Sequence, residues 1–166
     1  MTVVIQDAEV QALINDLISK TARPRAALDA VGTRIVARIR ATFVAGASPY
    51  GEKWAPLKFR RGRPLFKTGR TLFNRITHST SETSVDVGIF NKRSAEIGEK
   101  HQFGAVEKAP PGKFIIFKDE IHDKLVFARK IRIPARPFLP IRGSVADLPR
   151  TWIDDITALF EKDFEK

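Results

Sequence analysis

Histidines and carboxylates are the residue types in this sequence that could carry out acid–base or metal chemistry. The three histidines, His78, His101 and His122, are scattered, and none has a second ligand at a metal-binding spacing such as that of HExxH. The acids of Asp119–Glu120 and Asp154–Asp155 are adjacent in the sequence. Because adjacent residues on a helix point in different directions, neither pair forms a shared acid–base site by itself. The spacing of these residues favours no catalytic centre.

Other catalytic signatures are missing as well. The chain has no cysteine, which excludes disulfides, thiolate nucleophiles and Cys-based zinc or iron–sulfur sites. No nucleophile elbow, P-loop or dinucleotide fingerprint occurs in the sequence. We therefore predict no catalytic residue, no metal site and no cofactor. We expect His78 and His122 to be exposed and His101 to make a structural hydrogen bond.

Electrostatic binding is the chemistry that the sequence favours. The 166 residues carry a net charge of +10, and this charge is unevenly spread. Thirteen Lys or Arg face two acids between Arg23 and Arg75, whereas six acids outnumber three bases between Ala146 and Lys166. The basic part could face a polyanion, or basic and acidic surfaces could meet between copies of the chain. Charge alone leaves both interpretations open.

The stretch PYGEKWAPLKFRRGRPLFKTGRTL, residues 49–72, concentrates the basic charge in an irregular and aromatic segment. Its aromatic side chains could stack on bases or anchor the segment to the fold, and no named nucleic-acid-binding module is present. We predict a mobile basic loop at 46–64 with few long-range contacts and Trp54 as its anchor. The assembly- or DNA-facing residues would be Trp54, Lys58, Arg60, Arg61, Arg63, Lys67 and Arg70. If the loop docks on a neighbouring subunit, the candidate acidic partners are Asp154, Asp155, Glu161 and Asp163.

Apolar residues at steps of three and four predict helices at both ends of the chain. The first helix has Asp7 as its cap and an apolar face from Val10 to Ile18. The second begins at Pro24, and its apolar face consists of Leu28, Val31, Ile35, Ile39 and Phe43. The last has a capping-box-like start at Ser144–Asp147, and its apolar residues are Trp152, Ile153, Ile156, Leu159 and Phe160.

Short helices and hairpins are predicted between these ends. We expect a short helix over Thr68–Ile76, a helical piece that ends at Gly104, and two hairpins. The hairpins pair Ile76–Ser79 with Val85–Ile89 and Lys113–Lys118 with Leu125–Ile133. Hairpins without βαβ alternation imply an α+β fold, in which an antiparallel β-sheet packs against N-terminal helices and a C-terminal helix. We expect a single soluble, intracellular domain over residues 1–166, without a membrane span.

Several motifs occur in an order that is typical of one family. They are SPYGEKWAPL, PLFKTGRTLFNRI, VDVGIFNKRSAEIGEKHQFGA, IPARPFLPI and SVADLPRTWIDDITALF, and HQFG together with IPARPFL is the most specific pair. With these motifs the chain resembles the phage virion morphogenesis family, the tail completion proteins of contractile-tailed and Mu-like phages and prophages. The residues that match the family motifs are Gly69, Leu72, His101, Gln102, Phe103, Gly104, Pro134, Arg136, Pro137, Phe138 and Leu139.

The resemblance implies a non-enzymatic component that completes the head-proximal end of the tail or the neck between tail and head. Related neck and tail-end proteins form rings around the DNA channel, often with six-fold symmetry. The implied partners are therefore further copies of the chain in a ring, other tail or neck proteins, and DNA contacted non-specifically in the channel. The implied location is the virion, and the host cytoplasm during assembly. A basic module for non-specific nucleic-acid binding is the alternative function.

The prolines of IPARPFL make a local prediction possible. Pro134 and Pro137 fix two φ angles and keep their predecessors extended. We therefore predict a stiff extended segment at Ile133–Leu139 that leads towards the C-terminal helix. Phe138 and Leu139 should be buried, and Arg136 should bind a carboxylate or backbone carbonyls.

Overall fold

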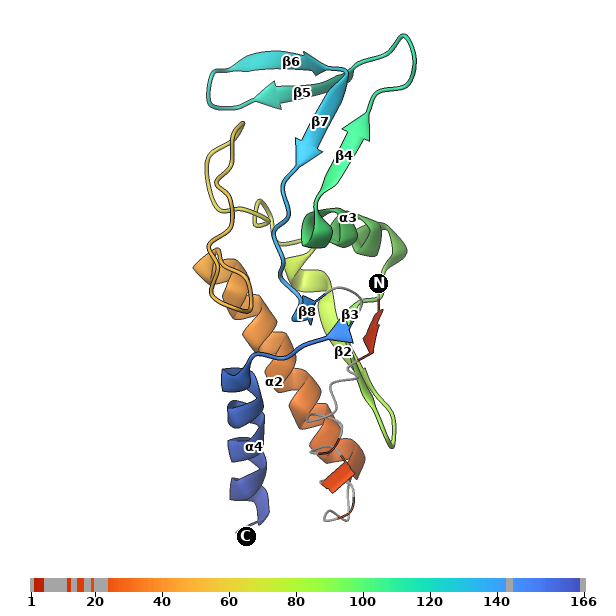
Figure 1. The fold of residues 1–166 in the computed structure, drawn as a ribbon, viewed down its shortest axis with the longest axis vertical. Helices are drawn as coiled ribbons and strands as arrows, with labels where there is room; N and C mark the ends of the chain where they lie inside the picture. The colour runs from red at the N-terminus through yellow and green to blue at the C-terminus, as the bar shows by residue number, and fades with distance from the viewer. Residues whose placement is uncertain are drawn as a thin grey trace.

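The computed structural model describes residues 2–4, 12, 15–16, 19, 24–142 and 145–164 of the chain. The described part is elongated, with two helices at one end and two strand ribbons at the other (Figure 1). The first predicted helix cannot be compared, because its cap Asp7 and its apolar residues lie outside the described residues: Val10, Leu13, Ile14, Leu17 and Ile18.

The helix α2 (Pro24–Ala45) is the element against which the sheet and the last helix pack. Its predicted apolar face is confirmed, because each side chain of that face is at most 1% exposed: Leu28, Val31, Ile35, Ile39 and Phe43. Gly46 follows the last residue of the helix with a φ of 64°, a conformation that ends helices and suits glycine. One long amphipathic helix thus forms one side of the hydrophobic core.

A three-stranded antiparallel sheet lies beside α2, in the order β1 (Thr2–Val4), β3 (Val85–Ile89), β2 (Ile76–Thr80). The predicted β2–β3 hairpin is confirmed. The expected helix over Thr68–Ile76 is wrong in extent, since only the 3₁₀ turn η1 (Phe73–Arg75) is helical. Ile76 pairs directly with Ile89, so the chain must already be extended where the helix was expected to end.

His78 of β2 packs against α2, and the prediction that its side chain is exposed is wrong. A Cβ atom on Gly32 would lie 2.5 Å from the Cδ2 atom of the His78 ring, so the glycine makes room for the imidazole. The His78 Nε2 atom lies 2.9 Å from the Oδ1 atom of Asp29 on the same helix. The sequence gives no sign that a single glycine of α2 would admit a ring from the sheet.

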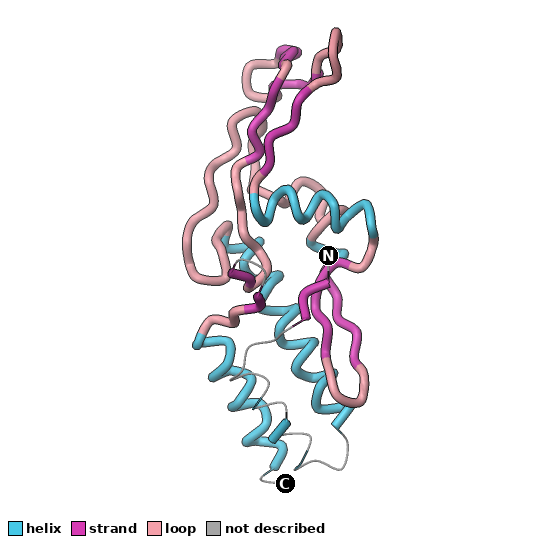
Figure 2. The backbone as a smooth tube through the Cα atoms, turned by 45° about the vertical axis from the view of Figure 1, so that its right-hand side comes forward, coloured by secondary structure: helices cyan, strands magenta, loops and turns pink. Residues whose placement is uncertain are grey.

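The helix α3 (Lys92–Phe103) leads into the strand ribbons. Asn91 caps it by accepting a hydrogen bond from the Ser94 amide, and the predicted end at Gly104 is confirmed. The strand that follows, β4 (Ala105–Lys108), pairs with β7 (Lys130–Ile133) in one antiparallel ribbon. β5 (Ile115–Asp119) and β6 (Lys124–Ala128) pair in a second ribbon at its far end (Figure 2).

The ribbons differ from the expected second hairpin in one respect. The predicted strand over Leu125–Ile133 divides at Arg129, and its second half pairs with β4, a strand that the sequence analysis missed. The Arg129 carbonyl accepts a hydrogen bond from the Ala109 amide at this junction. Pro110 and Pro111 follow Ala109 and lack amide protons, so the two ribbons cannot join in one continuous ladder there. The β4–β7 ribbon and the β5–β6 ribbon are consequently two separate sheets.

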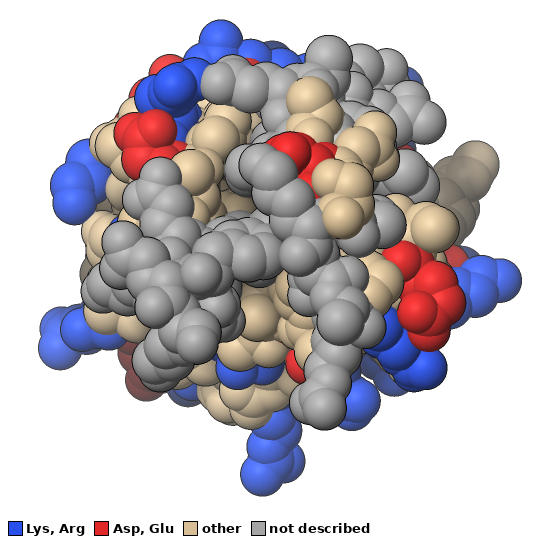
Figure 3. Space-filling model, turned by 90° about the horizontal axis from the view of Figure 1, so that it is seen from below, with Lys and Arg blue, Asp and Glu red and all other residues tan. Residues whose placement is uncertain are grey.

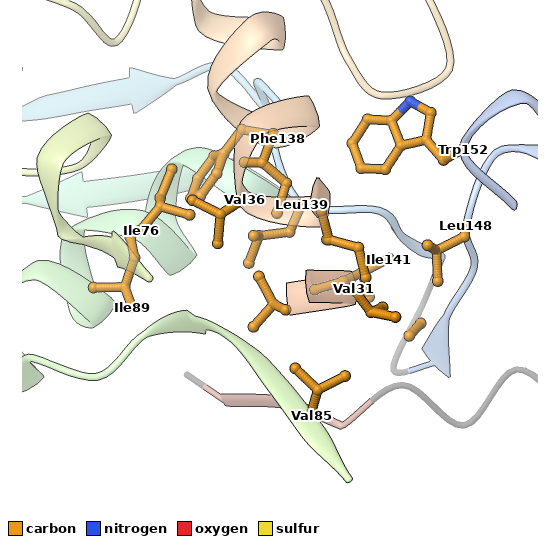
Figure 4. Packing of buried hydrophobic residues seen from close by; sticks show 14 of the residues in the cluster. Val31, Val36, Ile76, Val85, Ile89, Phe138, Leu139, Ile141, Leu148 and Trp152 are labelled. Carbon is orange, nitrogen blue, oxygen red and sulfur yellow. The ribbon is translucent and has the colours of Figure 1, made fainter. Parts of the chain in front are cut away.

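The chain returns along Ile133–Leu139 to the core and ends in α4 (Arg150–Phe164). Figure 4 shows Phe138, Leu139 and Ile141 of this return packed beside Val31 and Val36 of α2. Where a capped helix start was expected, Val145–Ala146 instead forms β9 and pairs with β8 (Ile141–Arg142).

The helix α4 therefore begins later than predicted, after Pro149, whose carbonyl accepts hydrogen bonds from the Trp152 and Ile153 amides. Trp152, Ile153 and Ile156 are buried as predicted, whereas the side chains of Leu159 and Phe160 are outside the description. The described fold is mixed α+β, with small antiparallel sheets of two or three strands, of which the three-stranded sheet packs against α2.

Candidate functional site

The two most specific sequence motifs, HQFG and IPARPFL, contact each other in the structure. Gln102 of α3 is 2% exposed, and its Oε1 atom accepts hydrogen bonds from the Phe138 amide at 2.9 Å and the Leu139 amide at 3.0 Å. Its Nε2 atom donates to the Leu139 carbonyl at 3.0 Å. One side-chain amide thus satisfies three backbone groups in the core, and Phe138 and Leu139 are buried as predicted. We call this arrangement the Gln102 clamp.

The same two motifs also meet through their backbones. The His101 carbonyl accepts a hydrogen bond of 2.6 Å from the Arg136 amide. Gly104 adopts φ 77° and ψ 159°, a conformation nearly restricted to glycine. A Cβ atom at this position would lie 3.1 Å from the Ala135 nitrogen and 3.2 Å from the Ile133 oxygen. The glycine is therefore required by both its dihedral angles and the neighbouring strand.

Arg136 joins this pair of motifs to the basic loop. Its Nε atom donates to the Ala55 carbonyl at 3.0 Å, and its Nη2 atom donates to the Pro56 carbonyl at 3.3 Å. Trp54 is buried with its ring edge-on to Phe43 at 5.5 Å, and its indole nitrogen donates to the Pro137 carbonyl at 2.8 Å. The predictions that Arg136 binds backbone carbonyls and that Trp54 anchors the loop are both confirmed.

The first part of the basic loop, 46–56, therefore makes long-range contacts, and the prediction of few such contacts is wrong for it. The Tyr50 hydroxyl adds another by donating to the Asp147 carbonyl at 2.7 Å. The basic and irregular character of the segment led to the expectation of few such contacts. Its carbonyl groups, rather than its side chains alone, are what the fold binds.

The second part of the basic loop, 57–64, contacts the β5–β6 ribbon. Phe59 stacks edge-on with Phe117 of β5 at 4.9 Å, and its carbonyl accepts a hydrogen bond from the Glu120 amide at 2.7 Å. Lys67 forms an ion pair with Glu120. Of the predicted basic residues, four are exposed and make no side-chain ion pair among the described residues: Lys58, Arg61, Arg63 and Arg70. The structure thus distributes these residues along the loop instead of gathering them into one patch.

The predicted acidic partners on α4 are partly occupied within the chain itself. Asp155 accepts hydrogen bonds from Arg34 at 2.6 and 2.5 Å and from Arg38 at 2.8 Å. These guanidinium groups lower the pKa of Asp155 to about 2. Asp154 lies 3.3 Å from Arg150, and the side chains of Glu161 and Asp163 are outside the description. Asp155 therefore holds α4 on α2 and is occupied within the chain.

An apolar surface on the outer ribbon is the feature that the sequence analysis missed. Phe114, Ile116, Leu125 and Phe127 are between 47% and 61% exposed, and Ile116 pairs directly across the ribbon with Phe127. The opposite face, which carries Phe117, is partly covered by Phe59 of the basic loop. We call the exposed face of β5–β6 the arm face. The alternation of apolar residues at 114, 116, 125 and 127 was the available signal, although alternation does not say which face is covered.

His122, Asp119 and His101 lie in contacts that hold the fold together. His122 is exposed as predicted, and its Nδ1 atom lies 2.7 Å from the Oδ2 atom of Asp119. Asp119 is buried and also accepts hydrogen bonds from the amides of Ile121 and His122, so it stabilises the β5–β6 turn. The structural hydrogen bond expected of the His101 side chain is not found, since its Nδ1 atom is buried without a partner among the described residues. The backbone carbonyl of His101 accepts the bond from the Arg136 amide instead.

The described residues lack two further features. No group of three or more His, Cys, Asp or Glu residues is placed to hold a metal ion among them. Within the same residues no helix combines the length and apolar character that crossing a membrane requires.

The comparisons with known proteins agree with the motif analysis. The model of the phage virion morphogenesis family matches residues 5–157. This range includes the Gln102 clamp, the basic loop and the arm face. No curated protein and no solved structure matches the chain.

Proposed function

The chain belongs to the phage virion morphogenesis family, and from this we propose that it is a non-enzymatic subunit of a ring that completes the head-proximal end of the tail or the head–tail neck. The family's role in virion morphogenesis supports a structural part of the virion. The ring would be homo-oligomeric, with six subunits as in related neck proteins, and other tail or neck proteins would bind to it. The site of action is the virion, and assembly takes place in the host cytoplasm.

The arm face is the observation that carries this proposal. A two-stranded ribbon is marginally stable by itself, and β5–β6 extends away from the helices (Figure 1). The basic loop supports one side of this ribbon through Phe59, while the arm face remains exposed. An exposed patch of large apolar side chains at the tip of an extension is typical of a protein–protein interface. We assign the arm face to contact with a neighbouring copy of the chain.

Charge supports a second copy as the occupant. The arm face is bordered by the exposed basic residues Lys113, Lys118, Lys124 and Arg129. Without Asp155, which is paired with Arg34 and Arg38, five acids and three bases remain between Ala146 and Lys166. This segment contains α4, which lies at the opposite end of the molecule. Viewed from below, that end shows acidic side chains in small groups, with Lys and Arg projecting around the rim (Figure 3). Two different surfaces at opposite ends are what a head-to-tail contact requires, and such contacts close into rings.

The alternative, a basic module for non-specific nucleic-acid binding, is favoured by one observation. Lys58, Arg61 and Arg63 are exposed and have no acidic partner among the described residues. Such cations can neutralise phosphates without reading a sequence. A ring around DNA would use them in its channel, so this alternative differs from the proposal chiefly in whether subunits assemble.

The proposal is tested by changing the arm face. The double variant Ile116→Ser, Phe127→Ser removes two side chains that are each 58% exposed. Burying the exposed part of such a side chain contributes about 1 kcal/mol, so the pair should weaken subunit association by about 2 kcal/mol, or roughly 30-fold. Sedimentation velocity over a concentration series measures this change. Val44→Ser is the matched control, because Val44 is 59% exposed but lies on α2.

Three results would contradict the proposal. One is a wild-type protein that stays monomeric at every concentration tested. Another is equal weakening by the arm variant and the Val44→Ser control. The third is an unchanged oligomer in the arm variant. Duplex binding by monomers that falls steeply with salt concentration would instead support the nucleic-acid alternative.

A further inference from the structure

A cavity of about 360 Å³ lies between the second part of the basic loop and α3. Its lining includes the cationic residues Arg60, Lys67 and Arg136, the ring of His101, and no Asp or Glu. We propose that this cavity binds the carboxylate of a glutamate side chain that a partner protein inserts. The inference deepens the proposed assembly role, since it names the chemical group that a partner supplies.

Lys67 is paired with Glu120, whereas the guanidinium groups of Arg60 and Arg136 form no ion pair among the described residues. Arg136 is buried, and its recorded hydrogen bonds go to the neutral carbonyls of Ala55 and Pro56. Burial and the charge of Arg60 lower the pKa of the Arg136 guanidinium, so its charged form is held at a cost. Arg60 itself donates to the carbonyls of Arg61 and Arg63. A buried cation without a counter-ion is destabilising, and an incoming anion would relieve this cost.

His101 provides a second, independent indication. Its Nδ1 atom is buried and has no hydrogen-bond partner among the described residues, and an unpaired buried polar atom is destabilising. Burial, together with the charge of Arg136, lowers the pKa of the imidazole, which is therefore neutral at neutral pH. His101 lines the cavity, and a carboxylate bound there would favour the protonated imidazole.

The walls of the cavity favour a glutamate over a phosphodiester. Aliphatic side chains of Leu57, Leu65, Leu72 and Ile97 line it beside the cations and would contact the methylene groups of a glutamate. Leu65 has a φ of 58°, an uncommon conformation for a bulky residue, in the turn that links Arg63 and Phe66. The volume lies at the lower end of the range for ligand pockets, and a phosphodiester would have to bring two sugars with it. Duplex DNA is therefore a poor fit.

The test uses the full chain and N-acetylglutamate α-amide, which represents a glutamate within a peptide. The ring resonances of His101 are followed by NMR during the titration, with N-acetylglutamine α-amide as the neutral control at matched ionic strength. We expect saturable shifts for the glutamate compound only. We also expect a rise in the pKa of His101, because a bound carboxylate stabilises the imidazolium.

Two arginine variants separate the cavity from general surface charge. Arg60→Gln removes a cation of the lining, whereas Arg61→Gln removes the same charge from the adjacent residue, which is exposed and outside the lining. We expect Arg60→Gln to weaken binding of the glutamate compound about 10-fold, as is typical for loss of one charge-assisted contact. Arg61→Gln should change it less than twofold. Neither variant changes an arm-face residue, and sedimentation reports ring formation while the NMR titration reports this site, so the two outcomes are measured separately.

Several results would overturn the inference. The first is the absence of a saturable His101 shift up to about 50 mM of the glutamate compound, which would mean a Kd weaker than about 50 mM. The second is equal weakening by the two arginine variants, which would show a diffuse charge effect. The third is binding of inorganic phosphate or a short duplex at the cavity as tight as that of the glutamate compound, which would assign it to phosphates.

Discussion

The Gln102 clamp can be tested quantitatively, because one side chain satisfies three buried backbone groups. Gln102→Met preserves the length and approximate volume of the side chain but removes both its acceptor and its donor. Each backbone group left without a partner costs at least about 1 kcal/mol, so we expect a loss of about 3 kcal/mol in the free energy of unfolding. For a chain of this size this corresponds to a fall in Tm of roughly 10 °C.

Urea unfolding followed by circular dichroism measures the change, and equal m-values would show that the two states remain comparable. Phe103→Met is the matched control, since Phe103 is the next residue of α3 and is 49% exposed. We expect this control to change the free energy of unfolding by less than about 1 kcal/mol, as is usual for surface substitutions. A Gln102→Met variant within about 0.5 kcal/mol of the wild type would refute the clamp as a stabilising contact.

Two further predictions concern the glycine of HQFG and the ion pair between the helices. Gly104→Ala should lower the free energy of unfolding by about 2–3 kcal/mol, against about 1 kcal/mol for the control Gly112→Ala, because both glycines have positive φ but only Gly104 faces nearby backbone atoms. Equal losses in urea unfolding would show that the dihedral angle alone matters. Asp155→Asn should reduce stability at neutral pH, and this difference from the wild type should vanish as the pH falls from about 4 to about 2, since the pKa of Asp155 is lowered to about 2 in the folded protein. A difference that persists unchanged at pH 2 in paired unfolding curves would contradict the assigned role of Asp155.

Helical periodicity was the most informative part of the sequence. The apolar steps from Leu28 to Phe43 predict the buried face of α2 correctly, since one long helix can satisfy this pattern in only one orientation. The β2–β3 hairpin was equally accessible, because strand alternation and a short polar turn are local signals. These features depend on residues that are close in the sequence.

The pairing of β4 with β7 could not be predicted in the same way. The partners are separated by the whole β5–β6 hairpin, and neither four-residue strand has a distinctive pattern. The position of His78 was predicted wrongly for a similar reason. Its packing against α2 depends on Gly32, which is distant in the sequence and has no side chain to indicate the contact. Likewise, the packing of 46–56 depends on bonds to its carbonyl groups, which every sequence has. Long-range contacts to the backbone leave little trace in residue types.

The basic loop links the HQFG and IPARPFL motifs to the β5–β6 ribbon. Through Ala55 and Pro56 the loop is bonded to Arg136, and through Phe59 it supports the inner side of the β5–β6 ribbon. Arg60 lies between these two attachments and lines the cavity. A carboxylate bound in the cavity would contact Arg60. Phe59, the residue before Arg60, packs directly on Phe117 of the ribbon. Because an isolated two-stranded ribbon is marginally stable, occupancy of the cavity should stiffen the arm before or while it binds its neighbour.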